Sequence, residues 1–160
     1  MEELSYGLDI QGLAVDFGNF KLDNITLGVP RGCITGLIGR NGAGKTTLIK
    51  TIMRLNDACA GRILYDGLYF PEHEEEVLNK IACVFDSPIY GKNYCLILAL
   101  CQGADILLLD EPTAGIDPFD RSAVVELIQE FMTDENHTVL FSTHITEDMD
   151  RIADYIAMIE

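Results

Sequence analysis

A glycine-rich loop near the start of the chain has the residue types needed to bind phosphate groups. Residues 39–46 read GRNGAGKT and follow an apolar run, residues 33–38, that is typical of a buried strand. Glycines let backbone N–H groups point at phosphate oxygens, and the helix expected next adds its positive N-terminal end. Lys45 would reach the terminal phosphates, and the Thr46 hydroxyl would ligate a metal ion, so the pattern predicts a nucleoside triphosphate with Mg²⁺. The residues expected to contact the nucleotide are Gly39, Asn41, Gly42, Ala43, Gly44, Lys45, Thr46 and Thr47.

Two carboxylates follow a second apolar run, residues 106–109, where Asp110 and Glu111 come next in the chain. In open α/β sheets, ligands bind at the carboxyl ends of the strands. Asp110, expected one residue beyond the strand, suits Mg²⁺ through its water shell, and Glu111 is placed to polarise a water for attack on the γ-phosphate. His144 ends another apolar run at the same edge of the sheet, so we expect it to contact the γ-phosphate.

Strands and helices alternate along the chain. Residues 12–29 alternate apolar and polar side chains around a turn at Gly18 and Asn19, which indicates antiparallel strands, and residues 61–69 read as a hairpin around Asp66 and Gly67. Further strands are expected at residues 33–38, 81–85, 105–109, 138–142 and 155–159, and helices at residues 46–55, 73–80, 93–101, 118–132 and 146–153. This order predicts a single α/β domain over residues 1–160, with a mostly parallel sheet covered by helices and an antiparallel β element on its N-terminal side.

The composition narrows the class of function. A chain of 160 residues with 48% hydrophobic content can form one domain with a core, and its formal net charge of -15 opposes binding to nucleic acid. No run approaches the roughly 18–20 apolar residues of a membrane span, and the start lacks a basic secretory signal, so a cytoplasmic location is expected. The chain has five scattered cysteines and no CxxC pair, so we expect reduced thiols in or near the core. They are Cys33, Cys59, Cys83, Cys95 and Cys101.

Four segments, taken in order, resemble the nucleotide-binding subunit of ATP-binding cassette (ABC) transporters. They are residues 39–47, residues 109–113 (LDEPT), residues 114–118 (AGIDP) and residues 142–144 (STH). The resemblance covers most of the chain and implies a P-loop ATPase that binds ATP and Mg²⁺.

The resemblance also assigns roles to single residues. It implies that Asp110 is the magnesium-side acid, that Glu111 is the catalytic base and that His144 is the switch histidine. It implies an aromatic residue stacked on adenine, which here would be Phe17, with Phe20 as the second choice. The loop of residues 114–117 would touch a partner subunit.

The chain departs from the family between residues 85 and 93. The family has an all-helical subdomain there that ends in a serine- and glycine-rich signature loop, and this chain has only residues 86–92 (DSPIYGK). We expect the subdomain to be missing near residues 90/91, either because this is a minimal domain or because residues between Tyr90 and Gly91 are left out of the printed sequence. The terminal elements of the family are expected to be cut short at Glu160. Asp86 stands where the family places a glutamine that contacts the metal, which makes it a further candidate ligand.

Together these features predict an ATP-binding and ATP-hydrolysing subunit of an ABC transporter. Two subunits would sandwich the nucleotide, and a transmembrane permease subunit would hold the chain at the inner face of the cell membrane. The alternative is a regulatory nucleotide-binding module with little or no turnover. The predicted catalytic residues are Lys45, Glu111 and His144, and the predicted metal ligands are Thr46, Asp110 and Asp86.

Overall fold

Five parallel strands form the central sheet of this chain, as the alternating pattern predicts. The computed structural model describes residues 5–86 and 92–160, and the strand order in the sheet is β6-β7-β8-β3-β9. The strands are β3 (Ile34–Ile38), β6 (Ile81–Val84), β7 (Ile106–Asp110), β8 (Thr138–Ser142) and β9 (Tyr155–Met158). The expected α/β fold class is confirmed.

A second, antiparallel sheet is built from the N-terminal part of the chain, in the order β2-β1-β4-β5. Its strands are β1 (Tyr6–Asp16), β2 (Lys21–Pro30), β4 (Ala60–Tyr65) and β5 (Leu68–Tyr69), and a 3₁₀ turn over Phe70–Glu72, which the sequence did not predict, follows β5. β1 starts six residues before the predicted element. The pairing of β1 with β2 shifts register between Ile10 and Leu13, next to Gly12 at φ 58°. This shift interrupts the alternation of apolar and polar side chains by which a strand is predicted from sequence.

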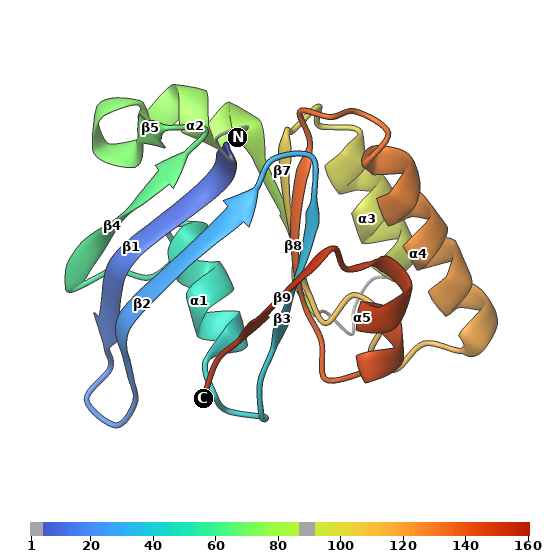
Figure 1. Cartoon of the computed structure of the whole chain (residues 1–160), viewed down its shortest axis with the longest axis horizontal. Helices are drawn as coiled ribbons and strands as arrows, with labels where there is room; N and C mark the ends of the chain where they lie inside the picture. The colour runs from blue at the N-terminus through green and yellow to red at the C-terminus, as the bar shows by residue number, and fades with distance from the viewer. Residues whose placement is uncertain (1–4, 87–91) are drawn as a thin grey trace.

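Helices cover the central sheet on both faces. They are α1 (Lys45–Ile52), α2 (Glu74–Lys80), α3 (Lys92–Leu100), α4 (Pro118–Phe131) and α5 (Thr146–Ile152). Figure 1 shows α1 between the antiparallel sheet and the central sheet, with α3, α4 and α5 on the opposite face. No helix in the described part of the chain is long and apolar enough to cross a membrane.

The inner strand β7 is a continuous apolar run because each of its faces is buried in a different core. Leu108 of β7 packs in the core that α1 shares with the antiparallel sheet. Its neighbours Leu107 and Leu109 pack in the other core, which contains Val124 and Ile128 of α4. A strand covered on both sides has no polar face, and this explains why the run lacks the alternation of an exposed strand.

The parallel arrangement brings three chain segments to one edge of the sheet. β3 ends at the glycine-rich loop, and β7 and β8 end beside each other, with Asp110 paired to Ser142 in register. Asp110 is therefore the last residue of β7 and is 4% exposed, whereas the sequence placed it one residue beyond the strand. The pairing with Ser142 extends the strand by that residue.

Candidate functional site

The glycine-rich loop joins β3 to α1 and has backbone conformations that require glycine. Gly42 lies at φ 84° and Gly44 at φ 107°, in the left-handed region that other residues rarely adopt. A Cβ atom on Gly44 would lie 2.6 Å from Leu22 Cδ2 and 2.8 Å from Phe20 Cζ. The β1–β2 hairpin therefore packs directly against the loop, and there is no space for a side chain at Gly44.

Lys45 is folded back onto its own loop. The ammonium donates hydrogen bonds to the carbonyl oxygens of Gly39, at 2.7 Å, and Arg40, at 3.3 Å, and it lies 3.9 Å from Glu111 Oε1. The residue is 7% exposed. A buried ammonium needs acceptors around it, and the loop carbonyls supply them here. Phosphate oxygens can replace these acceptors, so the site is compatible with an anionic ligand.

Asp110 is held by hydroxyl groups on both of its oxygens. Thr46 Oγ1 donates to Asp110 Oδ2 at 2.8 Å, and Ser142 Oγ donates to Asp110 Oδ1 at 2.7 Å. The contact between Thr46 and Asp110 joins two of the three predicted metal ligands. Burial, with a smaller contribution from the negative charge of Asp110, raises the pKa of the Cys83 thiol to about 12.

Ser142 is a site residue that the sequence analysis did not single out. It is completely buried, and its hydroxyl contacts both acidic residues, because Oγ also accepts a hydrogen bond from the Glu111 backbone N–H at 3.1 Å. The Ser142 carbonyl oxygen accepts from the same N–H at 3.1 Å. The available signal was a hydroxyl residue two positions before His144, at the end of the strand next to β7.

Glu111 and His144 contact each other directly. His144 Nδ1 lies 2.8 Å from Glu111 Oε2, and this contact needs a proton on Nδ1 because a carboxylate only accepts. Glu111 lies at φ 49°, an uncommon conformation for a residue with a side chain, and such conformations are concentrated at functional sites. The predicted catalytic residues Lys45, Glu111 and His144 are thus brought together at one edge of the sheet.

A cavity of about 430 Å³ lies over the glycine-rich loop. Its lining includes Lys45, Thr46, Glu111 and Phe20. Phe17, the first choice for stacking on adenine, is 53% exposed beside the β1–β2 turn and is not part of this lining. The second choice, Phe20, is the aromatic residue next to the phosphate site.

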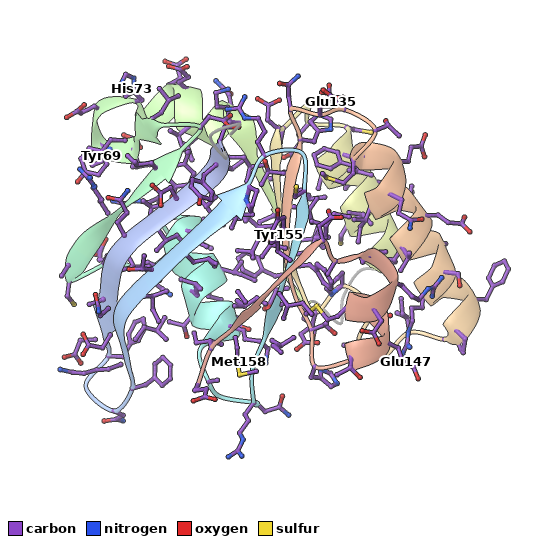
Figure 2. All side chains as sticks on the ribbon, viewed as in Figure 1. Tyr69, His73, Glu135, Glu147, Tyr155 and Met158 are labelled. Atoms are coloured by element: carbon purple, nitrogen blue, oxygen red, sulfur yellow. The ribbon has the colours of Figure 1, made fainter. Side chains whose placement is uncertain are left out.

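A larger cavity, about 690 Å³, lies against another side of the same loop. Its lining includes Met158 and Ile159 at the end of the chain, and Figure 2 shows the labelled Met158 there. Neither Lys45 nor Glu111 lines it, so the smaller cavity is the one lined by the residues that the sequence predicts to bind phosphate.

The oxygen donors at the site fit Mg²⁺. A hydroxyl from Thr46 and a carboxylate from Asp110 are the kinds of ligand that this ion takes, usually one or two from the protein together with waters and phosphate oxygens. The described residues contain no group of three or more His, Cys, Asp or Glu side chains arranged to hold a metal by themselves. The third predicted ligand, Asp86, is exposed two residues beyond β6.

Comparison with known proteins gives consistent relatives along nearly the whole chain. The family model described as ABC transporter matches residues 22–94. The chain is 27% identical to the ABC transporter ATP-binding protein YtrB of Bacillus subtilis, covering 92% of this chain and 66% of YtrB. It is 25% identical to the lantibiotic transport ATP-binding protein SrtF of Streptococcus pyogenes, covering 95% of this chain and 86% of SrtF.

The length of the YtrB alignment shows a deletion relative to that protein. The alignment runs over 193 positions, whereas 92% of a 160-residue chain is about 147 residues. About 46 positions of YtrB, the difference between 193 and 147, therefore have no counterpart in this chain.

Solved structures support the same assignment at the level of the fold. One described as the structure of an ATP-binding subunit of an ABC transporter has a TM-score of 0.84 at 21% identity and covers 99% of this chain and 86% of that one. A nucleotide-free ATP-binding cassette from an ABC transporter has a TM-score of 0.77 at 18% identity, covering 95% and 87%. The phosphate loop, the strand-end acids and these likenesses agree: this chain is similar in sequence and in fold to the ATP-binding subunits of ABC transporters.

Proposed function

We propose that this chain binds ATP with Mg²⁺ and hydrolyses the γ-phosphate, as the subunit that powers an ABC transporter. The observation that supports this most strongly is the 2.8 Å contact between Glu111 and His144 beside the Lys45 ammonium. A base, a group that orients it and a cation for the phosphates therefore meet at the end of the sheet, in the arrangement that phosphoryl transfer needs.

Three side chains would bind the phosphates and the metal. Lys45 exchanges the carbonyl oxygens of its own loop for oxygens of the terminal phosphates, and backbone N–H groups of the loop hold the remaining ones. Thr46 and Asp110 would hold Mg²⁺, with Asp86 as a further candidate. When bound, Mg²⁺ neutralises charge on the β- and γ-phosphate oxygens.

Glu111 would act as the base for the attacking water. The Nδ1–H of His144 donates a hydrogen bond to Glu111, which fixes the carboxylate, and the other ring nitrogen can donate to the γ-phosphate when it too carries a proton. Phe20 or Phe17 would stack on the adenine ring from the β1–β2 hairpin. In this arrangement the chain's own groups align the water and hold the phosphate, and these are the main contributions that a protein makes to such a reaction.

We propose a second nucleotide-binding subunit and a transmembrane permease as partners, at the inner face of the membrane. YtrB and SrtF are named as ATP-binding proteins of transporters, and this supports a membrane component. The segment of residues 114–117 begins three residues after Glu111, and its Gly115 and Asp117 are exposed. A partner that contacts this segment would sense the state of the catalytic glutamate.

We also propose that the missing residues are the helical subdomain, at the junction near residues 90/91. That junction lies outside the described residues. The elements before and after it, β6 and α3, have the positions that the sequence predicts, and the deficit of about 46 positions is large enough to include a small subdomain. If the chain acts without the subdomain, we expect slow turnover, and this keeps the regulatory binding module as the alternative.

The test is a comparison of ATP turnover in the native chain and in Glu111→Gln. We expect phosphate release to fall by about 100-fold or more, the usual contribution of a general base, while ATP affinity stays within about twofold. Glu130→Gln makes the same chemical change at an exposed position of α4 and should leave both quantities unchanged. Equal phosphate release by Glu111→Gln and the native chain would favour the binding module, and failure to bind ATP would reject both readings.

A further inference from the structure

Asp148 of α5 is a buried carboxylate to which the proposed reaction gives no role. It is 1% exposed, and its Oδ2 accepts a hydrogen bond from the Thr113 hydroxyl, which is 2% exposed. Its other oxygen, Oδ1, has no hydrogen-bond partner among the described residues. A carboxylate in such a position is costly unless its charge is compensated, so its presence calls for an explanation.

The compensating charge comes from α4. Arg121 Nε lies 4.0 Å from Asp148 Oδ1 and is itself buried without a hydrogen-bond partner in the described part of the chain. The same guanidinium reaches Glu147, the exposed α5 residue labelled in Figure 2, with Nη1 3.7 Å from Oε2. Asp148 therefore interacts with α4 by charge and with the segment after β7 by a hydrogen bond.

These contacts join the two segments that carry the catalytic residues. Thr113 is two residues after Glu111, and Asp148 is four residues after His144. The Glu111–His144 contact ties the segments together at the site, and the Thr113–Asp148 contact ties them again behind it. The Glu111 N–H also bonds to Ser142 just before His144, so the Thr113–Asp148 contact is the tie that holds the two segments farther from the strand ends.

We propose that Asp148 is a positioning residue that acts through Thr113. It holds the segment from Glu111 to Asp117 against the helix that follows His144, so that the glutamate and the exposed loop of residues 114–117 keep one fixed geometry. The inference rests on the proposed function, because it assigns Asp148 a place in the same reaction. Asp148 contacts no reacting group, and its loss should lower the rate of the chemical step without weakening ATP binding.

The matched variants are Thr113→Val and Thr113→Ser. Valine has the shape of threonine without the hydroxyl, and serine keeps the donor. We expect kcat to fall by about tenfold in Thr113→Val and in Asp148→Ala, with KM and ATP affinity within about twofold of the native chain, and Thr113→Ser to keep most of the rate. The double variant should be no slower than either single one, because both remove the same tie. Asp150→Asn, on the exposed side of α5, is the control.

Hydrogen exchange separates failure of this inference from failure of the proposed function. Amides of residues 113–117 should exchange about tenfold faster in Thr113→Val than in Thr113→Ser, while amides of β8 are unchanged. This readout needs no turnover, so it remains decisive if the native chain releases no phosphate and the proposed function fails. Equal exchange in the valine and serine variants would overturn the positioning role, as would equal kcat values in an active chain.

Discussion

Removal of the Ser142 hydroxyl tests whether the two acids share one buried support. In Ser142→Ala, Asp110 Oδ1 loses a hydrogen bond of 2.7 Å, and the Glu111 N–H keeps only the Ser142 carbonyl oxygen. A hydrogen bond to a charged group contributes about 1.5–3 kcal/mol, and the shared bond to the amide contributes about 0.5 kcal/mol. We therefore expect the free energy of unfolding to fall by about 2–3 kcal/mol, a large part of the roughly 5–15 kcal/mol that stabilises a domain.

Urea denaturation followed by circular dichroism measures this loss. Ser122→Ala removes a hydroxyl that donates only to the Pro118 carbonyl of its own helix, at 3.2 Å, and should change the free energy of unfolding by less than about 0.5 kcal/mol. Isothermal titration of ATP with and without Mg²⁺ gives a second readout. We expect Ser142→Ala to weaken binding of the Mg²⁺ complex more than binding of free ATP, because Asp110 is no longer held.

Two results would refute the reasoning. A loss in Ser142→Ala no larger than in Ser122→Ala would mean that the buried hydroxyl does not support Asp110. An equal change in affinity for ATP with and without Mg²⁺ would mean that the orientation of Asp110 does not matter to the metal.

Three further predictions concern the loop, the cysteines and a helix cap. Gly44→Ala should abolish ATP binding measured by titration, because the new Cβ would clash with the β1–β2 hairpin and φ 107° disfavours alanine. Cys59 and Cys101 are exposed and should react with a thiol reagent at pH 8 in the folded chain, whereas Cys83 should react only on unfolding. Burial raises the pKa of Cys83 from 9.0 to about 12, so between these pH values the folded chain keeps a proton that the unfolded chain releases. The free energy of unfolding therefore falls as pH rises through this range. Urea titrations at pH 8 and pH 10 should show a smaller fall in Cys83→Ala than in the native chain. Backbone N–H groups of the first turn of α4 lower the pKa of the Asp117 cap, so the cap stabilises the helix above pH 3.8 and loses this effect as pH falls. Asp117→Ala should therefore lower the melting temperature at pH 7. The melting temperature of this variant should also fall less in acid than that of the native chain.

The sequence was sufficient wherever a local pattern determines a local structure. Apolar runs predicted the central strands, Asp117 followed by Pro118 predicted the start of α4, and the glycine-rich loop was correctly expected between a buried strand and a helix. Parallel strand order then placed Glu111 and His144 together, because the ends of neighbouring strands meet at one edge.

What the sequence could not predict depends on contacts between distant residues. The contacts of Ser142 and Asp148 form only when β7, β8 and α5 pack together, and no residue spacing along the chain predicts them. The choice between Phe17 and Phe20 depends on the geometry of the hairpin. Cys59 and Cys101 were expected in or near the core and are exposed, because hydrophobic neighbours in sequence do not determine which way a side chain near a turn points.

The left-handed backbone of Glu111 has a consequence for how this domain can change. An L-residue in this conformation costs roughly 1–2 kcal/mol that glycine avoids. Glycine at position 111 should therefore raise the melting temperature while it removes the base. Under the proposed function, selection for thermal robustness alone would favour loss of this glutamate, so keeping it would favour activity over maximal stability.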